Sequence, residues 1–252
     1  MGFTKPIDVL VMGSARGLGR AFVQQCLAAS EVTRVWALGR SVESGIDGCD
    51  LSTGKRLRCL NADLTDDSSL AAVAAVLKAE GAQLDVVVNF AALLHTEDGM
   101  VPERKLADVD PDWVMRGFQV NALGPLLLAK HLHPFFPKRT RCLWVSLSAR
   151  VGSIGDNRLG GWYTYRGTKA ALNMFTRNLS IELGRRYRGL ICIAYHPGTC
   201  ATDLSAPFRG NVPPKKLFSP EQGAGYLCQV LSGLDDGDNG GFFAWDGQPV
   251  AW

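Results

Sequence analysis

The sequence predicts an α/β fold, in which a parallel β-sheet carries helices on both faces. Short apolar, β-branched segments alternate with segments of helical periodicity along all 252 residues. A glycine-rich turn joins the first apolar segment to the first helical one, and no linker-like stretch divides the chain. We therefore expect one domain over residues 1–252, with the functional residues in loops at the carboxyl ends of the strands.

The individual elements follow from apolar patterning and from capping residues. We expect strands over residues 7–12, 33–38, 57–60, 84–89, 141–147, 190–195 and 241–245. We expect helices over 18–29, 67–79, 111–136 and 165–186, and a last one from Ser219, where a capping residue, a proline and an acid follow one another. Pro125 has no N–H group, so it must kink or break the third of these helices.

The composition excludes several classes of protein. A net charge of +3 is too small to indicate nucleic-acid binding. No apolar window of ~20 residues is long enough to span a membrane, and the first residues lack the apolar core of a signal peptide, so we expect a cytoplasmic protein. The cysteines are odd in number and lack C-x-x-C spacing, which indicates buried reduced thiols rather than disulfides or a metal site: Cys26, Cys49, Cys59, Cys142, Cys192, Cys200 and Cys228.

Residues 13–19 read GSARGLG and lie between the first expected strand and the first helix. Glycines allow close backbone approach to a pyrophosphate, and a helix N-terminus offers free N–H groups; the alternative is a turn that binds nothing. This spacing resembles the short-chain dehydrogenase/reductase family. The resemblance implies a single-domain Rossmann-type, doubly wound sheet of about seven strands in the order 3-2-1-4-5-6-7. It also implies a nicotinamide dinucleotide bound by Gly13, Ser14, Arg16, Gly17, Leu18 and Gly19.

The residues after the second expected strand favour NADPH over NADH. Enzymes that use NAD usually place an acid there to bind the ribose 2′-hydroxyl, whereas residues 38–41 read LGRS. Arg40 can pair with a 2′-phosphate, and Arg16 can reach the same group. Unless both arginines are only solvated surface charges, we expect NADP(H) as the cofactor, with NADPH preferred at least ~10-fold in catalytic efficiency.

Tyr165 and Lys169 have Y-x-x-x-K spacing, which places both side chains on one face of a helix. The spacing is common by chance, but here it follows the fifth strand of a chain with a glycine loop. A free phenol has a pKa of about 10, and a neighbouring ammonium together with an oxidised nicotinamide ring favours the phenolate. Tyr165 can then protonate a carbonyl oxygen as hydride reaches the carbon, with the cofactor contacting both residues.

The expected catalytic serine is uncertain in position. In many members of the family it lies three residues before a glycine, and that position is Ala149 here, before Gly152. Ser148 occupies the preceding position, where side chains of an extended strand point the opposite way. We expect Ser148 to take the role if the backbone turns differently; otherwise the site for the substrate hydroxyl is impaired.

The resemblance also implies roles for residues in four other loops. Asp63 and Leu64 match the family's adenine contact, although Asp63 is alternatively an ordinary loop acid. Asn121 matches an asparagine whose carbonyl holds a water against the lysine in a proton relay; alternatively it is an internal polar residue of a helix. Asn89 and Ala91 match a motif that stabilises the sheet beside the cofactor, with Ala92 in place of a glycine. The segment that holds the nicotinamide carboxamide matches Pro197, Gly198, Cys200 and Thr202.

Residues 204–218 are expected to cover the substrate with a mostly apolar surface, with aromatic contacts from Trp162 and Phe208. Residues 148–157 and the last eight residues are similar to the C-factor or sniffer-type carbonyl reductase branch of the family. The expected function is NADPH-dependent reduction of a small-molecule aldehyde, ketone or quinone. The alternative is an NADP-binding signalling or redox-sensing protein with weak or lost catalysis, which Ala149 and Ala92 favour. His196 is interpreted as structural rather than catalytic, and the choice between monomer and homo-oligomer stays open.

Overall fold

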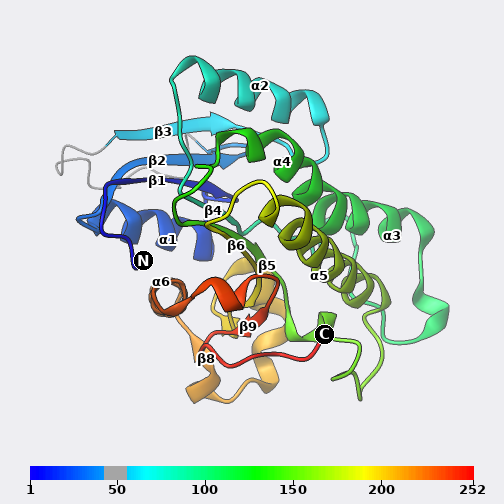
Figure 1. Cartoon of the computed structure of the whole chain (residues 1–252). Coiled ribbons are helices and arrows are strands. Elements are labelled where there is room, and N and C mark those ends of the chain that lie inside the picture. The colour runs from blue at the N-terminus through cyan, green and yellow to red at the C-terminus, as the bar shows by residue number, and fades with distance from the viewer. Residues whose placement is uncertain (43–55) are drawn as a thin grey trace.

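The structure is a computed structural model that describes residues 1–42 and 56–252. Within these residues the strands form a seven-stranded parallel sheet in the order β3-β2-β1-β4-β5-β6-β9. This order confirms the predicted Rossmann-type topology (Figure 1). The strands of the main sheet are β1 (Ile7–Met12), β2 (Val32–Gly39), β3 (Arg56–Asn61), β4 (Val86–Asn89), β5 (Cys142–Leu147), β6 (Leu190–His196) and β9 (Phe242–Ala244). A separate two-stranded sheet contains β7 (Thr199–Cys200) and β8 (Leu217–Phe218).

Six α-helices connect the strands of the described chain: α1 (Gly17–Ala28), α2 (Asp67–Ala79), α3 (Pro111–Phe118), α4 (Gly124–Leu132), α5 (Tyr163–Gly184) and α6 (Pro220–Gly233). Short 3₁₀ turns lie at η1 (Leu106–Asp108), η3 (His133–Phe135), η4 (Arg150–Gly152), η5 (Asp203–Asn211), η6 (Pro214–Lys216) and η7 (Asp236–Asp238). The region expected to cover the substrate therefore consists largely of 3₁₀ turns and a short strand.

The long helix expected over 111–136 is broken, as Pro125 requires. Between α3 and α4 the chain forms one π-helical turn, η2 (Gln119–Leu123). Pro125 cannot donate to the carbonyl of Asn121 four residues earlier, so the regular α-helical ladder cannot pass through this point. Gly124 allows a close approach here, because a Cβ on it would lie 2.6 Å from the Cβ of Leu64.

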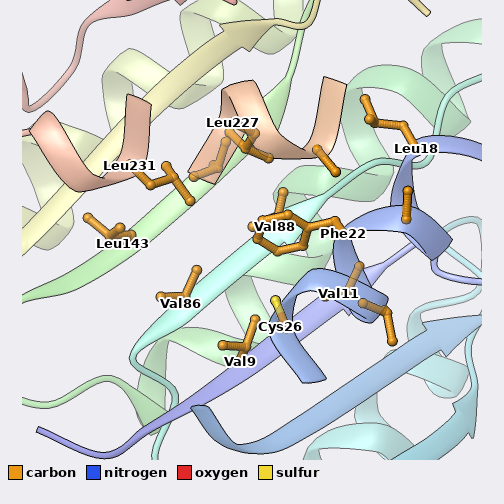
Figure 2. Packing of buried hydrophobic residues seen from close by; sticks show 14 of the residues in the cluster. Val9, Val11, Leu18, Phe22, Cys26, Val86, Val88, Leu143, Leu227 and Leu231 are labelled. Carbon is orange, nitrogen blue, oxygen red and sulfur yellow. The ribbon is translucent and has the colours of Figure 1, made fainter. Parts of the chain in front are cut away.

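Two apolar layers hold the helices against the sheet. Alternate residues of the central strands face α1 and α6, where Val11 and Val88 pack near Phe22 and Leu227 (Figure 2). The residues between them face α2, α4 and α5 on the other side. Each fully buried Val, Leu or Phe side chain contributes about 1.5–3 kcal/mol. A sheet that is buried on both faces explains why its strands are continuous apolar runs.

The cysteines follow the expectation where the structure describes them. Cys26, Cys142, Cys192 and Cys200 are buried cysteines in the reduced form, and Cys59 and Cys228 are half-buried cysteines in the reduced form. Cys49 lies outside the described residues. No helix in the described ranges is both long and apolar enough to cross a membrane.

Candidate active site

The structure brings Tyr165 and Lys169 together one turn apart near the start of α5. The Nζ atom of Lys169 lies 5.6 Å from the centre of the Tyr165 ring and donates a 2.8 Å hydrogen bond to the carbonyl of Leu147, the last residue of β5. Lys169 is only 1% exposed. The helix thus presents both groups at the carboxyl end of the central strands, where ligands of such sheets bind.

Burial sets the proton affinity of both groups. It lowers the pKa of Lys169 to about 7 and raises the pKa of Tyr165 above its ordinary value. The sequence predicts a lowered pKa for Tyr165, whereas the protein alone has the opposite direction. The reason is that burial disfavours both the phenolate and the ammonium that would attract it. Tyr165 therefore keeps its proton at neutral pH, which is the form that a general acid needs.

Asn121 links the π turn to α5. Its Nδ2 donates to the hydroxyl of Thr168 at 3.1 Å and to the carbonyl of Leu93 at 2.7 Å, and its Oδ1 accepts the Leu93 N–H. Because Pro125 has no N–H, the backbone carbonyl of Asn121 lacks the usual donor four residues ahead. This leaves the carbonyl with the acceptor capacity that the expected water-mediated relay to Lys169 requires.

The Ser148 hydroxyl is engaged away from Tyr165. It donates a 2.6 Å hydrogen bond to Oδ1 of Asn173, and the Nδ2 of Asn173 donates to the carbonyl of Gly152. Asn173 lies two helical turns beyond Tyr165 and is buried. Ala149 has an extended backbone and is half-buried, directly before η4. A catalytic role for Ser148 stays a prediction, and this hydrogen bond competes with it.

The glycine loop fits an anionic group at the N-terminus of α1. No side chain caps this helix, and its first turn contains no acid. A Cβ on Gly19 would lie 2.1 Å from the carbonyl oxygen of Gly13, and one on Gly13 would lie 2.7 Å from the N atom of Ala91. Gly13 and Gly17 have positive φ angles of 80° and 54°. Only glycines permit this tight turn, so the free N–H groups of the helix stay open to a pyrophosphate.

Two polar side chains support the loop from neighbouring strands. The hydroxyl of Ser14 donates to the carbonyl of Leu38 at the end of β2. Oδ1 of Asn89 accepts the Ala91 N–H at 3.1 Å, while Nδ2 of Asn89 is buried without a partner among the described residues. A buried donor without a partner is costly, so this amide fits a site that is completed by a ligand.

The residues expected to contact the adenosine part lie around the same edge. Arg40 is exposed directly after β2, and a Cβ on Gly39 would lie 4.0 Å from the Cβ of Ala15 in the glycine loop. Arg16 forms an exposed 3.5 Å ion pair with Asp203, which is a weak interaction that a phosphate can replace.

Asp63 and Leu64 follow β3 at this edge. Oδ1 of Asp63 accepts hydrogen bonds from both the N–H and the hydroxyl of Thr65, so the carboxylate shapes the turn. Leu64 is buried against Gly124. Contact with adenine stays a prediction for both residues.

The segment after β6 meets the glycine loop, as the nicotinamide role requires. A Cβ on Gly17 would lie 3.1 Å from the Cγ2 of Thr202, and Gly198 has a φ of 71°. Burial raises the pKa of the Cys200 thiol to about 12, so this thiol is a poor nucleophile, and a backbone contact of Cys200 with the carboxamide stays a prediction. Pro197 accepts a 3.6 Å contact from the Cys200 thiol, which holds the turn.

Aromatic rings form a wall beside Tyr165. The Trp162 ring lies 6.1 Å from that of Tyr165 and 5.0 Å from that of Phe208 in η5. His95, from the loop after β4, lies 5.8 Å from Phe208, and its Nε2 is 3.2 Å from the carbonyl of Asp203. Contact of Trp162 and Phe208 with the substrate stays a prediction, and His95 adds a polar edge to the wall.

Sequence reasoning missed Thr168, Asn173, Glu103 and His95. Thr168 and Asn173 lie three and eight residues after Tyr165 on the same helix, so helical spacing was the signal that could have found them. Glu103 and His95 reach the site from loops distant in sequence, and no local pattern indicates such contacts. His196 has a buried Nδ1 without a partner in the described chain, and burial lowers its pKa to about 4. A neutral imidazole in this position agrees with a structural interpretation.

Comparison with known proteins places the chain in a family. The family model described as short chain dehydrogenase matches residues 8–212. The chain is 30% identical over 244 residues to 1-hydroxy-2-glutathionyl-2-methyl-3-butene dehydrogenase of Rhodococcus sp. (strain AD45), covering 97% of this chain and 99% of that protein. It is also 35% identical over 147 residues to C-signal of Myxococcus xanthus, covering 58% of this chain and 83% of that protein.

Two solved structures have the same architecture. The NADPH-bound carbonyl reductase from chicken fatty liver superposes with a TM-score of 0.84 at 29% identity, covering 100% of this chain and 96% of that chain. The carbonyl reductase Sniffer of D. melanogaster gives a TM-score of 0.84 at 26% identity, covering 98% and 100%. With the glycine loop and the Tyr165–Lys169 pair in place, the chain belongs to the short-chain dehydrogenase/reductase family of oxidoreductases.

Proposed function

We propose that this protein reduces a carbonyl group of a small molecule with NADPH, and that Tyr165 is the general acid. The observation that carries the proposal is the pairing of the half-buried Tyr165 with the buried Lys169, at the same strand ends as an uncapped helix N-terminus lined by glycines. The similarity to NADPH-bound and NADP-bound reductases supports the choice of cofactor.

The cofactor is held by the three segments that meet at the strand ends. The N–H groups at the start of α1 bind the pyrophosphate, and Arg16 and Arg40 pair with the 2′-phosphate. The backbone at Cys200 and the hydroxyl of Thr202 hold the carboxamide. When bound, NADPH supplies hydride to the carbonyl carbon.

Tyr165 provides the proton. As negative charge develops on the substrate oxygen, the protonated phenol donates to it, and the Lys169 ammonium stabilises the phenolate that is left. The carbonyl of Asn121 accepts a hydrogen bond from a water molecule that returns a proton through Lys169. Since Ala149 has no hydroxyl, Tyr165 is the principal donor to the substrate oxygen.

The substrate occupies the space beside the aromatic wall. Trp162 and Phe208 exclude water from the reacting carbon, which strengthens every electrostatic interaction there. An aldehyde, ketone or quinone fits such a site, because its reactive group needs only one donor.

The test is NADPH oxidation with a panel of simple aldehydes, ketones and quinones. We expect turnover in the wild-type protein and a loss of about 10²–10⁴-fold in kcat for Tyr165→Phe. NADPH binding, measured by fluorescence titration, should stay within about threefold, since the phenol hydroxyl contributes little to the ground state. Equal turnover by Tyr165→Phe would remove Tyr165 from the mechanism.

A second candidate is an NADP-binding signalling or redox-sensing protein with weak catalysis. Ala149 favours it, together with the hydrogen bond that engages the Ser148 hydroxyl. The same panel separates the two functions. Tight NADPH binding with no oxidation by any carbonyl supports the sensor, whereas turnover by the wild-type protein supports the enzyme.

A further inference from the structure

Glu103 is a buried carboxylate to which the proposed mechanism assigns no part. It lies in the loop before η1 and is 3% exposed. Among the described residues no ion pair involves it; its carboxylate instead accepts the Thr164 N–H at 3.1 Å and the Thr164 hydroxyl. An acid beside the first N–H groups of a helix satisfies them and interacts favourably with the helix dipole.

The backbone of Glu103 holds the residue that precedes the helix. The N–H of Trp162 donates a 2.6 Å hydrogen bond to the Glu103 carbonyl. Trp162 has a left-handed backbone with φ 52°, an unfavourable conformation for a large side chain. The carbonyl of Glu103 therefore supports the strained backbone of Trp162, and the carboxylate of Glu103 supports the first turn of α5.

Thr164 is fixed from a third side as well. A Cβ on Gly117 of α3 would lie 2.6 Å from the Cγ2 of Thr164. Thr164 is the neighbour of Tyr165, and Trp162 contacts the Tyr165 ring. A shift at Thr164 thus moves the general acid and the aromatic wall together.

We infer that Glu103 is a positioning residue, which fixes Trp162 and Thr164 so that Tyr165 faces the substrate carbonyl. The expected effect on turnover rests on the proposed function. Displacing a reacting group by about 1 Å costs on the order of 10²-fold in rate. The glycine loop is supported by other contacts, so cofactor affinity is independent of Glu103.

The experiment compares Glu103→Gln, Glu103→Ala and Thr164→Val with the control Glu97→Gln, which changes an exposed acid of the same loop. All are assayed well below their unfolding temperatures. We expect Glu103→Ala to lose at least ~30-fold in kcat and to raise KM, with NADPH affinity within about twofold. Glu103→Gln keeps one acceptor oxygen and should rescue most of the turnover, and Glu97→Gln should match the wild type.

Amide hydrogen exchange tests whether Glu103 fixes the start of α5, and it does so independently of any activity assay. The peptide covering residues 160–166 should lose protection in Glu103→Ala and keep it in Glu97→Gln. If the wild type turns over no carbonyl, the proposed function fails while the exchange result still tests Glu103. The inference is overturned if exchange at 160–166 is unchanged in Glu103→Ala, or if Glu103→Ala lowers only the unfolding temperature and leaves kcat and KM within twofold. Should Glu103→Ala not fold, Thr164→Val, which removes the hydroxyl that the Glu103 carboxylate binds, decides by the same criteria.

Discussion

At the scale of single residues, the site is built from buried polar groups with few partners. Lys169 is buried and donates a hydrogen bond to the Leu147 carbonyl, and burial lowers its pKa to about 7. The protein therefore contains an amine that changes charge near neutral pH. A group of this kind suits a proton relay, because it can both donate and accept at working pH.

Lys169 should make stability depend on pH. Its folded-state pKa lies below the unfolded value of about 10.4, so the unfolded chain binds more protons between about pH 7 and pH 10. The free energy of unfolding should then rise with pH through this window, by up to about 1.4 kcal/mol per pH unit. Urea titrations of the cofactor-free wild type and of Lys169→Met at pH 6.5, 8 and 9.5 check this. The free energy of unfolding of the wild type should increase relative to that of the variant at each increase in pH. A difference that stays constant with pH would contradict the lowered pKa of Lys169.

Replacing the Ser148 hydroxyl tests whether its role is structural or catalytic. In Ser148→Ala the buried Oδ1 of Asn173 loses its donor, so the free energy of unfolding should fall by about 1–3 kcal/mol. Thermal melts measure this loss, and Ala149→Ser serves as the partner variant that restores a hydroxyl at the family position. If Ser148→Ala keeps its turnover while Tyr165→Phe does not, Ser148 is not the catalytic serine.

At the scale of elements, the close approach of backbone segments to one another determines where a cofactor can lie. The turn between β1 and α1 folds back so closely that Gly13 and Gly19 leave no room for side chains. The π turn η2 likewise depends on an unusual backbone, and it places Asn121 against Leu93 and Thr168. Both features depend on residues that permit unusual backbone geometry, namely glycine and proline.

Replacing Gly19 should therefore damage the whole turn. In Gly19→Ala the new Cβ meets backbone atoms of Gly13, so the loop must open, and we expect both a loss of NADPH binding and a clearly lower unfolding temperature. Gly233→Ala is the matched control, because a Cβ there meets nothing within 4 Å. Calorimetry with and without NADPH measures both effects. A Gly19→Ala protein that binds NADPH like the wild type would show that the loop does not hold the pyrophosphate.

At the scale of the whole molecule, cofactor binding and stability are linked. A ligand that binds only the folded protein stabilises it by about 2.7 kcal/mol at a hundred times its Kd. The proposed site spans the glycine loop, β2 and the segment after β6, so NADPH should raise the unfolding temperature of the whole sheet rather than of one region.

Arg40 should determine whether NADPH or NADH stabilises the protein more. Arg40→Ala removes a charge-assisted contact to the 2′-phosphate, and we expect about 10-fold weaker NADPH binding with NADH binding unchanged. The exposed Arg158→Ala should leave both affinities as in the wild type. Thermal shift titrations with the two dinucleotides measure the difference. Equal losses for NADPH and NADH would contradict a contact to the phosphate.

The resemblance to a known family predicted the strand order, and the sequence by itself determined the strand positions, the glycine turn and the Tyr165–Lys169 pair. Each of these depends on residues close together in the chain: apolar periodicity, glycines before a helix, and two side chains one helical turn apart. Only the tertiary structure decided that Glu103 meets Thr164, and that Asn173, rather than Tyr165, receives the Ser148 hydroxyl. These contacts join residues 61 and 25 positions apart, whose approach depends on how helices pack on the sheet. Local patterns carry no information about which buried donor such packing brings to which acceptor.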